Sequence, residues 1–190
     1  MKISRVINSF FRSCSYVINR DGTSWVVDCG DVALLLPLID GELRGVFLTH
    51  AHYDHIYGLN TLLEMFPAML IYTNEAGKVE LLNDKRNFSR YISDPFILQE
   101  PEKVVLVEDG HGIDLYEGCQ AIPIFTPGHS PSCVTWVIRN AVFTGDSYIP
   151  GVKTVTNFPL SDRAQAAASE LVIRDLIAHR EVYPGHAPES

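Results

Sequence analysis

The feature that most restricts the fold and chemistry of this chain is the segment His50-Ala51-His52-Tyr53-Asp54-His55, which directly follows an apolar run at residues 46–49. Imidazole and carboxylate groups are ligands that borderline divalent metals prefer. His50 and His52 lie two positions apart at the end of an expected strand, so their rings point to the same side and can share one metal. Asp54 and His55 follow where the chain must turn, and can face a second metal. The segment therefore predicts a metal site at the end of a buried strand.

Three further candidate ligands come from elsewhere in the chain and share one local pattern. Each lies on a tight turn directly after an expected strand, with a glycine beside it. A rigid scaffold presents site residues from a sheet edge in this way. The three are His129 after residues 122–125, Asp146 after residues 141–144, and His186 after residues 182–183.

Expected strands and helices alternate along most of the chain. Apolar runs between turn signals predict strands at residues 16–18, 25–28, 45–49, 69–72, 104–107, 118–125, 133–138, 141–144 and 182–183. Helices are expected at residues 32–39, 56–66, 74–83 and 161–178, the third capped by Asn74 and the fourth by Ser161. Residues 84–102 show no clear pattern. The interleaved order predicts an α/β architecture in which both faces of the sheet are covered.

Size and charge restrict the class of partner. At 190 residues the chain is expected to form one domain, residues 1–190, with a substantial core. A net charge of −8 without a basic stripe argues against a nucleic-acid partner. The sequence has no apolar region typical of a signal peptide and no run of 18 apolar residues, so we expect no membrane partner and a cytoplasmic location. The four cysteines lack CxxC spacing and are expected to be buried free thiols.

Five motifs, in this order, resemble those of metallo-β-lactamase-fold hydrolases, and most of all the glyoxalase II-like branch. The resemblance runs from about Val17 to His186, which is nearly the whole chain. It implies a four-layer αββα sandwich with two divalent metal ions at one edge. The motifs are WVVDCG at residues 25–30, THAHYDH at 49–55, TPGHS at 126–130, FTGDS at 143–147 and YPGH at 183–186.

The resemblance also implies a role for each candidate ligand. Zn²⁺ is the favoured metal, although iron and manganese accept the same nitrogen and oxygen ligands. Asp28 would lie near the site as a buried residue outside the ligand set. The implied ligands are His50, His52 and His129 for the first metal, Asp54, His55 and His186 for the second, and Asp146 as a bridge between the two metals.

The implied function is metal-dependent hydrolysis of a small-molecule substrate. A hydroxide that bridges the two metals would attack an electrophilic carbon, while one metal stabilises the developing oxyanion. Asp54 or Asp146 would orient this hydroxide. The resemblance favours a thioester or another activated ester as the substrate. The segments expected to form the pocket wall, residues 85–101 and 147–160, show no pattern specific for a substrate.

Two other classes of function stay open. Persulfide dioxygenase-like oxidoreductases share the fold and a similar six-residue segment but bind one iron, and a noncatalytic metal-binding module would keep the ligands without the chemistry. Glyoxalase II has a C-terminal helical domain that supplies much of its glutathione site, whereas this sequence ends four residues after His186. We therefore expect a relative of that enzyme rather than a glyoxalase II. β-Lactamases are less favoured, because they typically lack the bridging aspartate that Asp146 resembles.

Overall fold

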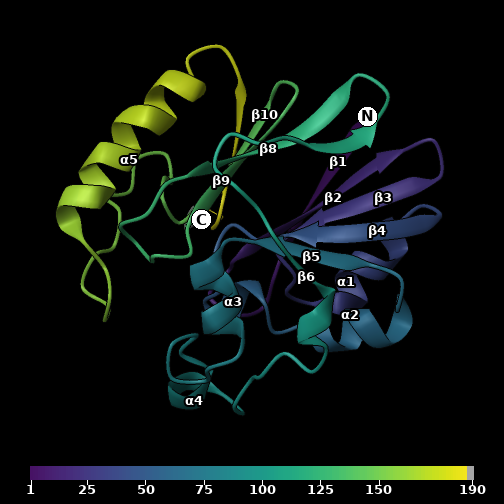
Figure 1. Ribbon diagram of the computed structural model, residues 1–190, viewed down its shortest axis with the longest axis horizontal. Helices are drawn as coiled ribbons and strands as arrows, with labels where there is room; N and C mark the ends of the chain where they lie inside the picture. Colours follow the sequence, from purple (N-terminus) through teal and green to yellow (C-terminus); the bar gives the residue numbers. More distant parts are fainter. Residues whose placement is uncertain (188–190) are drawn as a thin grey trace.

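Two β-sheets pack face to face in the computed structural model, which describes residues 1–187, and helices cover the outer side of each sheet (Figure 1). The first sheet has the strand order β1-β2-β3-β4-β5-β6, and the second has the order β11-β10-β9-β8-β7. Each sheet is therefore built from one continuous half of the chain. The four-layer αββα sandwich expected from the sequence is confirmed.

The first sheet contains β1 (Lys2–Ile7), β2 (Cys14–Arg20), β3 (Thr23–Val27), β4 (Glu42–Phe47), β5 (Leu70–Thr73) and β6 (Val104–Leu106). The second contains β7 (Ile113–Tyr116), β8 (Cys119–Phe125), β9 (Val134–Ile138), β10 (Ala141–Gly145) and β11 (Glu181–Pro184). The helices are α1 (Val32–Leu35), α2 (Leu59–Met65), α3 (Glu75–Leu81), α4 (Ser89–Ile92) and α5 (Arg163–Leu176). Short 3-10 turns are η1 (Leu36–Leu38), η2 (Tyr53–His55) and η3 (Pro101–Lys103). Among the described residues, no helix has the length and apolarity needed to cross a membrane.

The side chains of β3 show why the first sheet is buried on both faces. Trp25 and Val27 belong to the core between the two sheets, whereas Val26 between them belongs to the core under the helices. This alternation follows from the two-residue repeat of a strand. Figure 1 shows α1, α2 and α3 along the outer side of this sheet, and α5 along the outer side of the second.

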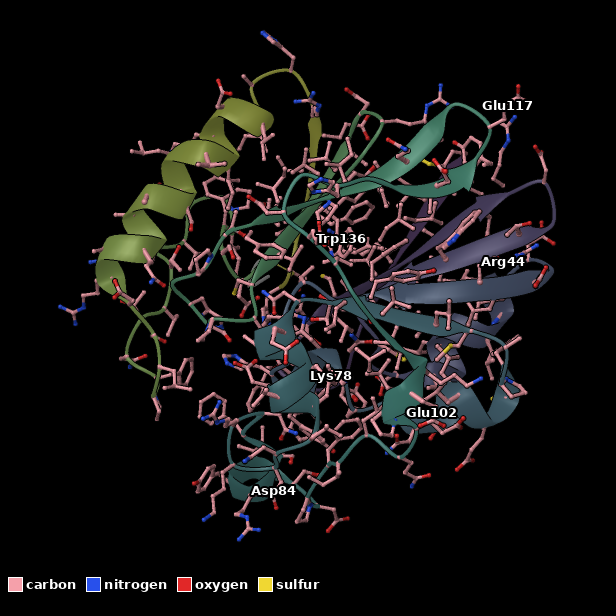
Figure 2. All side chains as sticks on the ribbon, in the orientation of Figure 1. Arg44, Lys78, Asp84, Glu102, Glu117 and Trp136 are labelled. Atoms are coloured by element: carbon pink, nitrogen blue, oxygen red, sulfur yellow. The ribbon has the colours of Figure 1, made fainter. Side chains whose placement is uncertain are left out.

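Trp136 on β9 fills the centre of the core between the sheets, where Figure 2 shows it on the inner side of the second sheet. It is fully buried, and its ring centroid lies 4.7 Å from that of Phe47 at the end of β4. Its Nε1 donates a hydrogen bond to the carbonyl oxygen of Leu48 at 2.8 Å. Trp136 thus fixes the end of β4 against the second sheet, next to the six-residue segment.

The structure contains two strands that the sequence patterns did not predict, β1 and β7. Both are edge strands, the first in one sheet and the last in the other. Most side chains of β1 are exposed or half-buried, and those of β7 are half-buried or exposed. Charged and polar side chains interrupt the apolar residues of these two strands, so neither has the apolar run on which the prediction of strands depends.

The predicted cap of α5 is wrong by one residue, and that of α3 is confirmed. Asp162 caps α5, because its Oδ1 accepts hydrogen bonds from the backbone N–H groups of Ala164 and Gln165 at 2.8 and 2.9 Å. Ser161 instead donates its hydroxyl to the carbonyl oxygen of His129 at 2.6 Å. Asn74 accepts from the N–H of Gly77 at 2.8 Å, as expected for the cap of α3.

Candidate metal centre

The seven predicted site residues lie together at one edge of the sandwich, on connections that follow strands of both sheets. Strand β9 is antiparallel to β8 and β10, and β10 is parallel to β11, so the carboxyl ends of β8, β10 and β11 meet at the same edge. The first sheet supplies four residues after β4, namely His50, His52, Asp54 and His55. The second sheet supplies His129 after β8, Asp146 after β10 and His186 after β11.

Three overlapping groups of three side chains have the arrangement needed to hold a metal ion. Within each group, one potential ligand atom of every residue lies within 4.8 Å of the others. Each group combines residues from both sheets. Two of them share no residue: the first group, His50, His52 and His129, and the second group, Asp54, His55 and His186. The remaining group, His50, His55 and Asp146, shares one residue with each of these two. The first and second groups coincide with the two ligand sets that the resemblance implies, and the role of each residue as a ligand stays a prediction.

Asp146 lies between the two groups. Its Oδ2 is 3.6 Å from Nε2 of His129 in the first group and 3.3 Å from Nε2 of His186 in the second. Its Oδ1 is 3.6 Å from Nε2 of His55. One carboxylate therefore reaches both groups, which is the position that a bridging ligand requires.

Unpartnered polar atoms support the fit of a cation. Nε2 of His50 and Oδ1 of Asp146 are buried without a hydrogen-bond partner among the described residues. A buried polar atom without a partner costs about 1–3 kcal/mol, and a bound cation removes that cost. Ring nitrogens also approach each other, with Nδ1 of His52 3.0 Å from Nε2 of His129. Nitrogen and carboxylate donors that converge in this way fit a divalent cation of borderline softness.

The outer nitrogens of three imidazoles are held by acceptors behind the site. Nδ1 of His129 donates to the carbonyl oxygen of Val155, and Nδ1 of His186 donates to that of Phe11, both at 2.9 Å. Nδ1 of His55 donates to Oδ2 of Asp28, also at 2.9 Å. A proton fixed on the outer nitrogen leaves the lone pair of the inner nitrogen free for a metal.

Asp28 fixes a second imidazole through Thr49. The backbone N–H and the hydroxyl of Thr49 donate to Oδ1 and Oδ2 of Asp28 at 2.7 and 2.6 Å. Because the Thr49 hydroxyl proton is used in this way, the hydroxyl oxygen accepts from Nδ1 of His50 at 3.2 Å. This leaves Nε2 of His50 without a proton and directed at the centre. The position of Asp28 behind the site agrees with what the resemblance implies.

The charges of the second group favour ionised carboxylates. Burial alone would raise the pKa of Asp146, but the hydrogen bond from His186 and the charge of His55 hold this pKa well below its usual range. Burial likewise disfavours the charged form of Asp54, and His55 and His186 lower its pKa. Burial also opposes protonation of the two imidazoles, yet the carboxylates raise the pKa of His55 to about 9 and that of His186 to about 11. Without a cation, protons on these rings balance the carboxylates.

The first group behaves differently, because it contains three neighbouring imidazoles and no carboxylate. Burial lowers the pKa of His50 well below its usual range, and neighbouring imidazoles add to this shift. Burial and the charge of His129 lower the pKa of His52 to about 3. These rings are neutral at physiological pH, which is the state in which an imidazole binds a metal.

Glu80 supports the site from α3, and the sequence analysis did not identify it. Ser130 donates its hydroxyl to Oε1 of Glu80 at 2.9 Å, and the hydroxyl of Ser132 makes a short hydrogen bond to Oε2. The hydroxyl of Ser132 also accepts from the N–H of Ala51, between two predicted ligands, at 3.2 Å. Glu80 shares the buried face of α3 with Gly77. Glu80 follows Gly77 by three positions, so the two residues share one face of the helix. This spacing was the sequence signal that could have indicated a buried glutamate.

The sequence matches the family described as the metallo-beta-lactamase superfamily over residues 9–186. A probable metallo-hydrolase of Streptococcus pyogenes serotype M6 is 27% identical over 203 residues, which cover 100% of this chain and 85% of that relative. The hydroxyacylglutathione hydrolase of Salmonella arizonae is 29% identical over 149 residues, which cover 76% of this chain and 51% of that enzyme. The matched region thus spans about half of the Salmonella enzyme.

The solved structures show the same fold. The crystal structure of the BLEG-1 B3 metallo-beta-lactamase superposes with a TM-score of 0.85 at 22% identity, over 98% of this chain and 92% of that one. At this level of identity the likeness concerns the fold and does not extend to the reaction.

Proposed function

The chain belongs to the metallo-beta-lactamase superfamily, and from this premise we propose that it is a metal-dependent hydrolase that cleaves a thioester or another activated ester. One observation carries the proposal. Two groups of three ligand atoms lie on either side of Asp146, whose carboxylate reaches both groups. This arrangement suits two cations held side by side, rather than one cation held for structure alone.

The proposed ligand sets are those that the family resemblance implies. His50, His52 and His129 would hold one cation, Asp54, His55 and His186 the other, and Asp146 both. Bound divalent cations would supply an activated water molecule at neutral pH and a Lewis acid for the carbonyl oxygen of the substrate. We propose Zn²⁺ as the metal, because imidazole nitrogens dominate the ligand set.

The chain itself would orient the reactants. Asp54 and Asp146 stay ionised, because the imidazoles around them lower their pKa, so either carboxylate can accept a hydrogen bond from the attacking water. Asp28, Val155 and Phe11 hold the imidazoles from behind, which keeps the centre rigid before the substrate arrives. The side chains of Asp54, Asp146 and His186 are 12%, 15% and 18% exposed, so the substrate would enter over these three.

The substrate class rests on the relatives. Hydroxyacylglutathione, named in the Salmonella enzyme, is a thioester. A small-molecule substrate and the lack of a nucleic-acid partner suit the net charge of −8. We propose the cytoplasm as the compartment, because Cys14, Cys29, Cys119 and Cys133 are all buried free thiols, as expected, and a reducing compartment keeps thiols in this form.

The decisive experiment combines the metal content per chain, measured on protein purified without added metal, with hydrolysis of a small panel of thioesters and activated esters. We expect about two metal ions per chain and turnover of at least part of the panel. One iron per chain, no hydrolysis, and oxygen uptake with a persulfide would replace this proposal by the dioxygenase alternative. Bound metal without either activity would favour a noncatalytic module.

A further inference from the structure

Two phenylalanines and two predicted ligands form a cluster of four rings beside the metal centre. The Phe88 ring packs edge-on against His52, with a centroid distance of 4.8 Å. The Phe158 ring lies 5.7 Å from His52 and 5.7 Å from His129, also edge-on. The two phenyl rings lie 5.3 Å apart. We call Phe88 and Phe158 the phenyl pair.

The backbone of Phe88 is held in an unusual conformation that directs its ring to the centre. Its φ is +66°, in the left-handed region that a phenylalanine rarely adopts. The neighbouring Asn87 is fully buried, and its side-chain amide donates to the carbonyl oxygens of Glu80 and Phe96 at 3.2 and 3.0 Å. Its own carbonyl oxygen accepts from the N–H of Tyr53 at 2.8 Å. The strained turn is thus tied directly to the six-residue metal segment.

Phe158 comes from a different part of the chain and is fixed just as directly. Its segment begins at Val155, whose carbonyl oxygen holds Nδ1 of His129, and ends at Ser161, whose hydroxyl donates to the carbonyl oxygen of the same histidine. Between these two anchors Phe158 lies over His129 with 41% of its surface exposed. The phenyl pair is therefore a preorganised apolar wall with one face open to solvent, beside the first group of ligands.

Exposed aromatic surface next to a reactive centre has a cost that a ligand can remove. The exposed rings would contribute to binding if an apolar group of the substrate covered them. A negatively charged group at this position would gain nothing from the faces of the rings and would lose part of its hydration. The wall belongs to the two segments, residues 85–101 and 147–160, that the sequence placed at the substrate pocket without indicating a preference.

We propose that Phe88 and Phe158 determine substrate specificity by binding an apolar acyl group, alkyl or aryl, attached to the reacting carbonyl. This inference rests on the proposed hydrolase function and specifies its substrate class. The phenyl pair touches the acyl group and is not part of the metal-binding machinery. Small acyl groups leave the rings uncovered, negatively charged acyl groups lose hydration there, and both are poorer substrates.

The test uses two readouts on the full chain loaded with Zn²⁺. The first is kcat/KM for esters that share one thiol or phenol leaving group and carry acetyl, butanoyl, hexanoyl or phenylacetyl groups. The second is the dissociation constant of the corresponding free carboxylates, which requires no turnover. In the unaltered protein we expect both readouts to improve about two- to fourfold per added methylene, since a fully buried methylene is worth about fourfold.

The variants are Phe88→Ala and Phe158→Ala, with Phe88→Leu and Phe158→Leu as conservative partners. For the hexanoyl and phenylacetyl compounds, each alanine variant should lose about tenfold in kcat/KM and in carboxylate affinity. For the acetyl compounds both quantities should change little. The leucine variants should recover most of the loss measured with the hexanoyl compounds. Tyr91→Ala is the matched control, because Tyr91 belongs to the same segment, is 66% exposed and lies outside the four-ring cluster. Metal content must be unchanged in every variant.

The outcomes separate this inference from the proposed function. Turnover with a chain-length preference that survives both alanine substitutions would overturn the inference and leave the hydrolase standing. Turnover without any preference for apolar acyl groups would also overturn it. Absence of turnover would overturn the proposed function. The binding of the free carboxylates would then test the inference by itself. It would support the inference only if the protein prefers apolar carboxylates and the alanine variants abolish that preference.

Discussion

Asp28 orients imidazoles of both ligand groups from behind the candidate centre, although it is not itself a predicted ligand. It accepts a hydrogen bond from Nδ1 of His55 and, through the Thr49 hydroxyl, determines which nitrogen of His50 faces the cation site. One carboxylate therefore fixes an imidazole in each of the two ligand groups. Asp28 is only 1% exposed. This burial raises the pKa of its carboxyl group, although the charge of His55 and the hydrogen bonds from His55 and Thr49 act in the opposite direction.

The first prediction at the scale of residues concerns this carboxylate. Asp28→Asn removes the charge that holds the proton on Nδ1 of His55, so the affinity for Zn²⁺ should fall by about 10- to 100-fold. Competition with a fluorescent chelator measures this affinity. Asp31→Asn is a suitable control, because Asp31 accepts hydrogen bonds from Ser9 and Tyr57 at the partly exposed start of α1. An unchanged affinity in Asp28→Asn would show that Asp28 does not orient the ligands.

The second prediction concerns the ligands themselves. His52→Ala or Asp146→Ala should remove metal and hydrolytic activity together, because each residue would supply a donor atom to the proposed metal centre. Far-ultraviolet circular dichroism should show the fold retained, since both side chains lie at the edge of the sandwich. A variant that kept full metal content and turnover would refute the assignment of that residue.

Sequence patterns identify the ligands better than the groups that orient them. His50, His52, Asp54 and His55 are recognisable because their spacing is unusual, and all four converge in the structure. The acceptors behind His129 and His186 are the backbone carbonyls of Val155 and Phe11. Any residue type offers a carbonyl, so no residue pattern could have pointed to them.

At the scale of elements, α3 couples the helical layer to the metal centre. Glu80 on this helix receives the hydroxyls of Ser130 and Ser132, and Asn74 at its start donates to the carbonyl oxygen of Pro131 at 3.3 Å. The loop that carries His129 therefore rests on the helix at three points. A shift of α3 would displace this ligand.

A third prediction follows from the burial of Glu80, which raises its pKa above the usual value of 4.5. The folded state then holds the proton more tightly than the unfolded state does. Proton binding by Glu80 therefore adds to the free energy of unfolding. This stabilisation is fully present below the pKa that Glu80 has in the unfolded chain, and it is lost as the pH rises through the higher pKa of the folded state. A glutamine at this position does not titrate. The free energy of unfolding of Glu80→Gln minus that of the unaltered protein should therefore be larger at pH 8 than at pH 5.

Urea unfolding of both proteins at the two pH values measures this difference. Glu75→Gln is a matched control, since Glu75 lies on the same helix with its side chain exposed. The prediction fails if the difference between Glu80→Gln and the unaltered protein is the same at both pH values.

The elements themselves were predictable where their burial is regular. Helix α3 and its Asn74 cap follow from local sequence, and so do the strands buried on both faces, such as β9. The edge strands β1 and β7 lack an apolar run, and α4 lies in a segment, residues 84–102, whose structure depends on contacts of the buried Asn87. Tertiary contacts of this kind leave no periodic trace in the sequence.

At the scale of the whole molecule, the centre joins the two sheets. The first sheet contributes four of the predicted ligands and the second contributes three, so each cation would bind residues of both. Binding should therefore stabilise the docking of one sheet on the other, in addition to the contacts of Trp136 between them. Without cations, the same position holds two buried carboxylates and an unpartnered imidazole nitrogen.

The fourth prediction is that Zn²⁺ raises the melting temperature of the whole molecule. A ligand at 100 times its dissociation constant adds about 2.7 kcal/mol to the free energy of unfolding, which corresponds to roughly 5–11 °C for a domain of this size. Calorimetry with a chelator and with excess Zn²⁺ measures the shift. His52→Ala should show a much smaller shift, and an equal shift in this variant would place the stabilising cation elsewhere.

The overall architecture was predictable only through the resemblance. Alternating strands and helices indicate a layered α/β fold, but a local pattern does not say that β6 ends one sheet and β7 begins another. The order of the five motifs supplied that information. Pairing between strands far apart in the sequence depends on packing, which single residues do not encode.

The separation of the two sheets along the chain has one further consequence. Strands β1 to β6 and strands β7 to β11 occupy successive halves, and the turn around Gly110 between them has space around it and a φ of +73°. A chain cut at this turn would yield two polypeptides, each with a complete sheet and an incomplete set of ligands. The apolar core between the sheets would bring the two polypeptides together, and only the assembled pair would offer complete ligand sets, so added Zn²⁺ should strengthen their association.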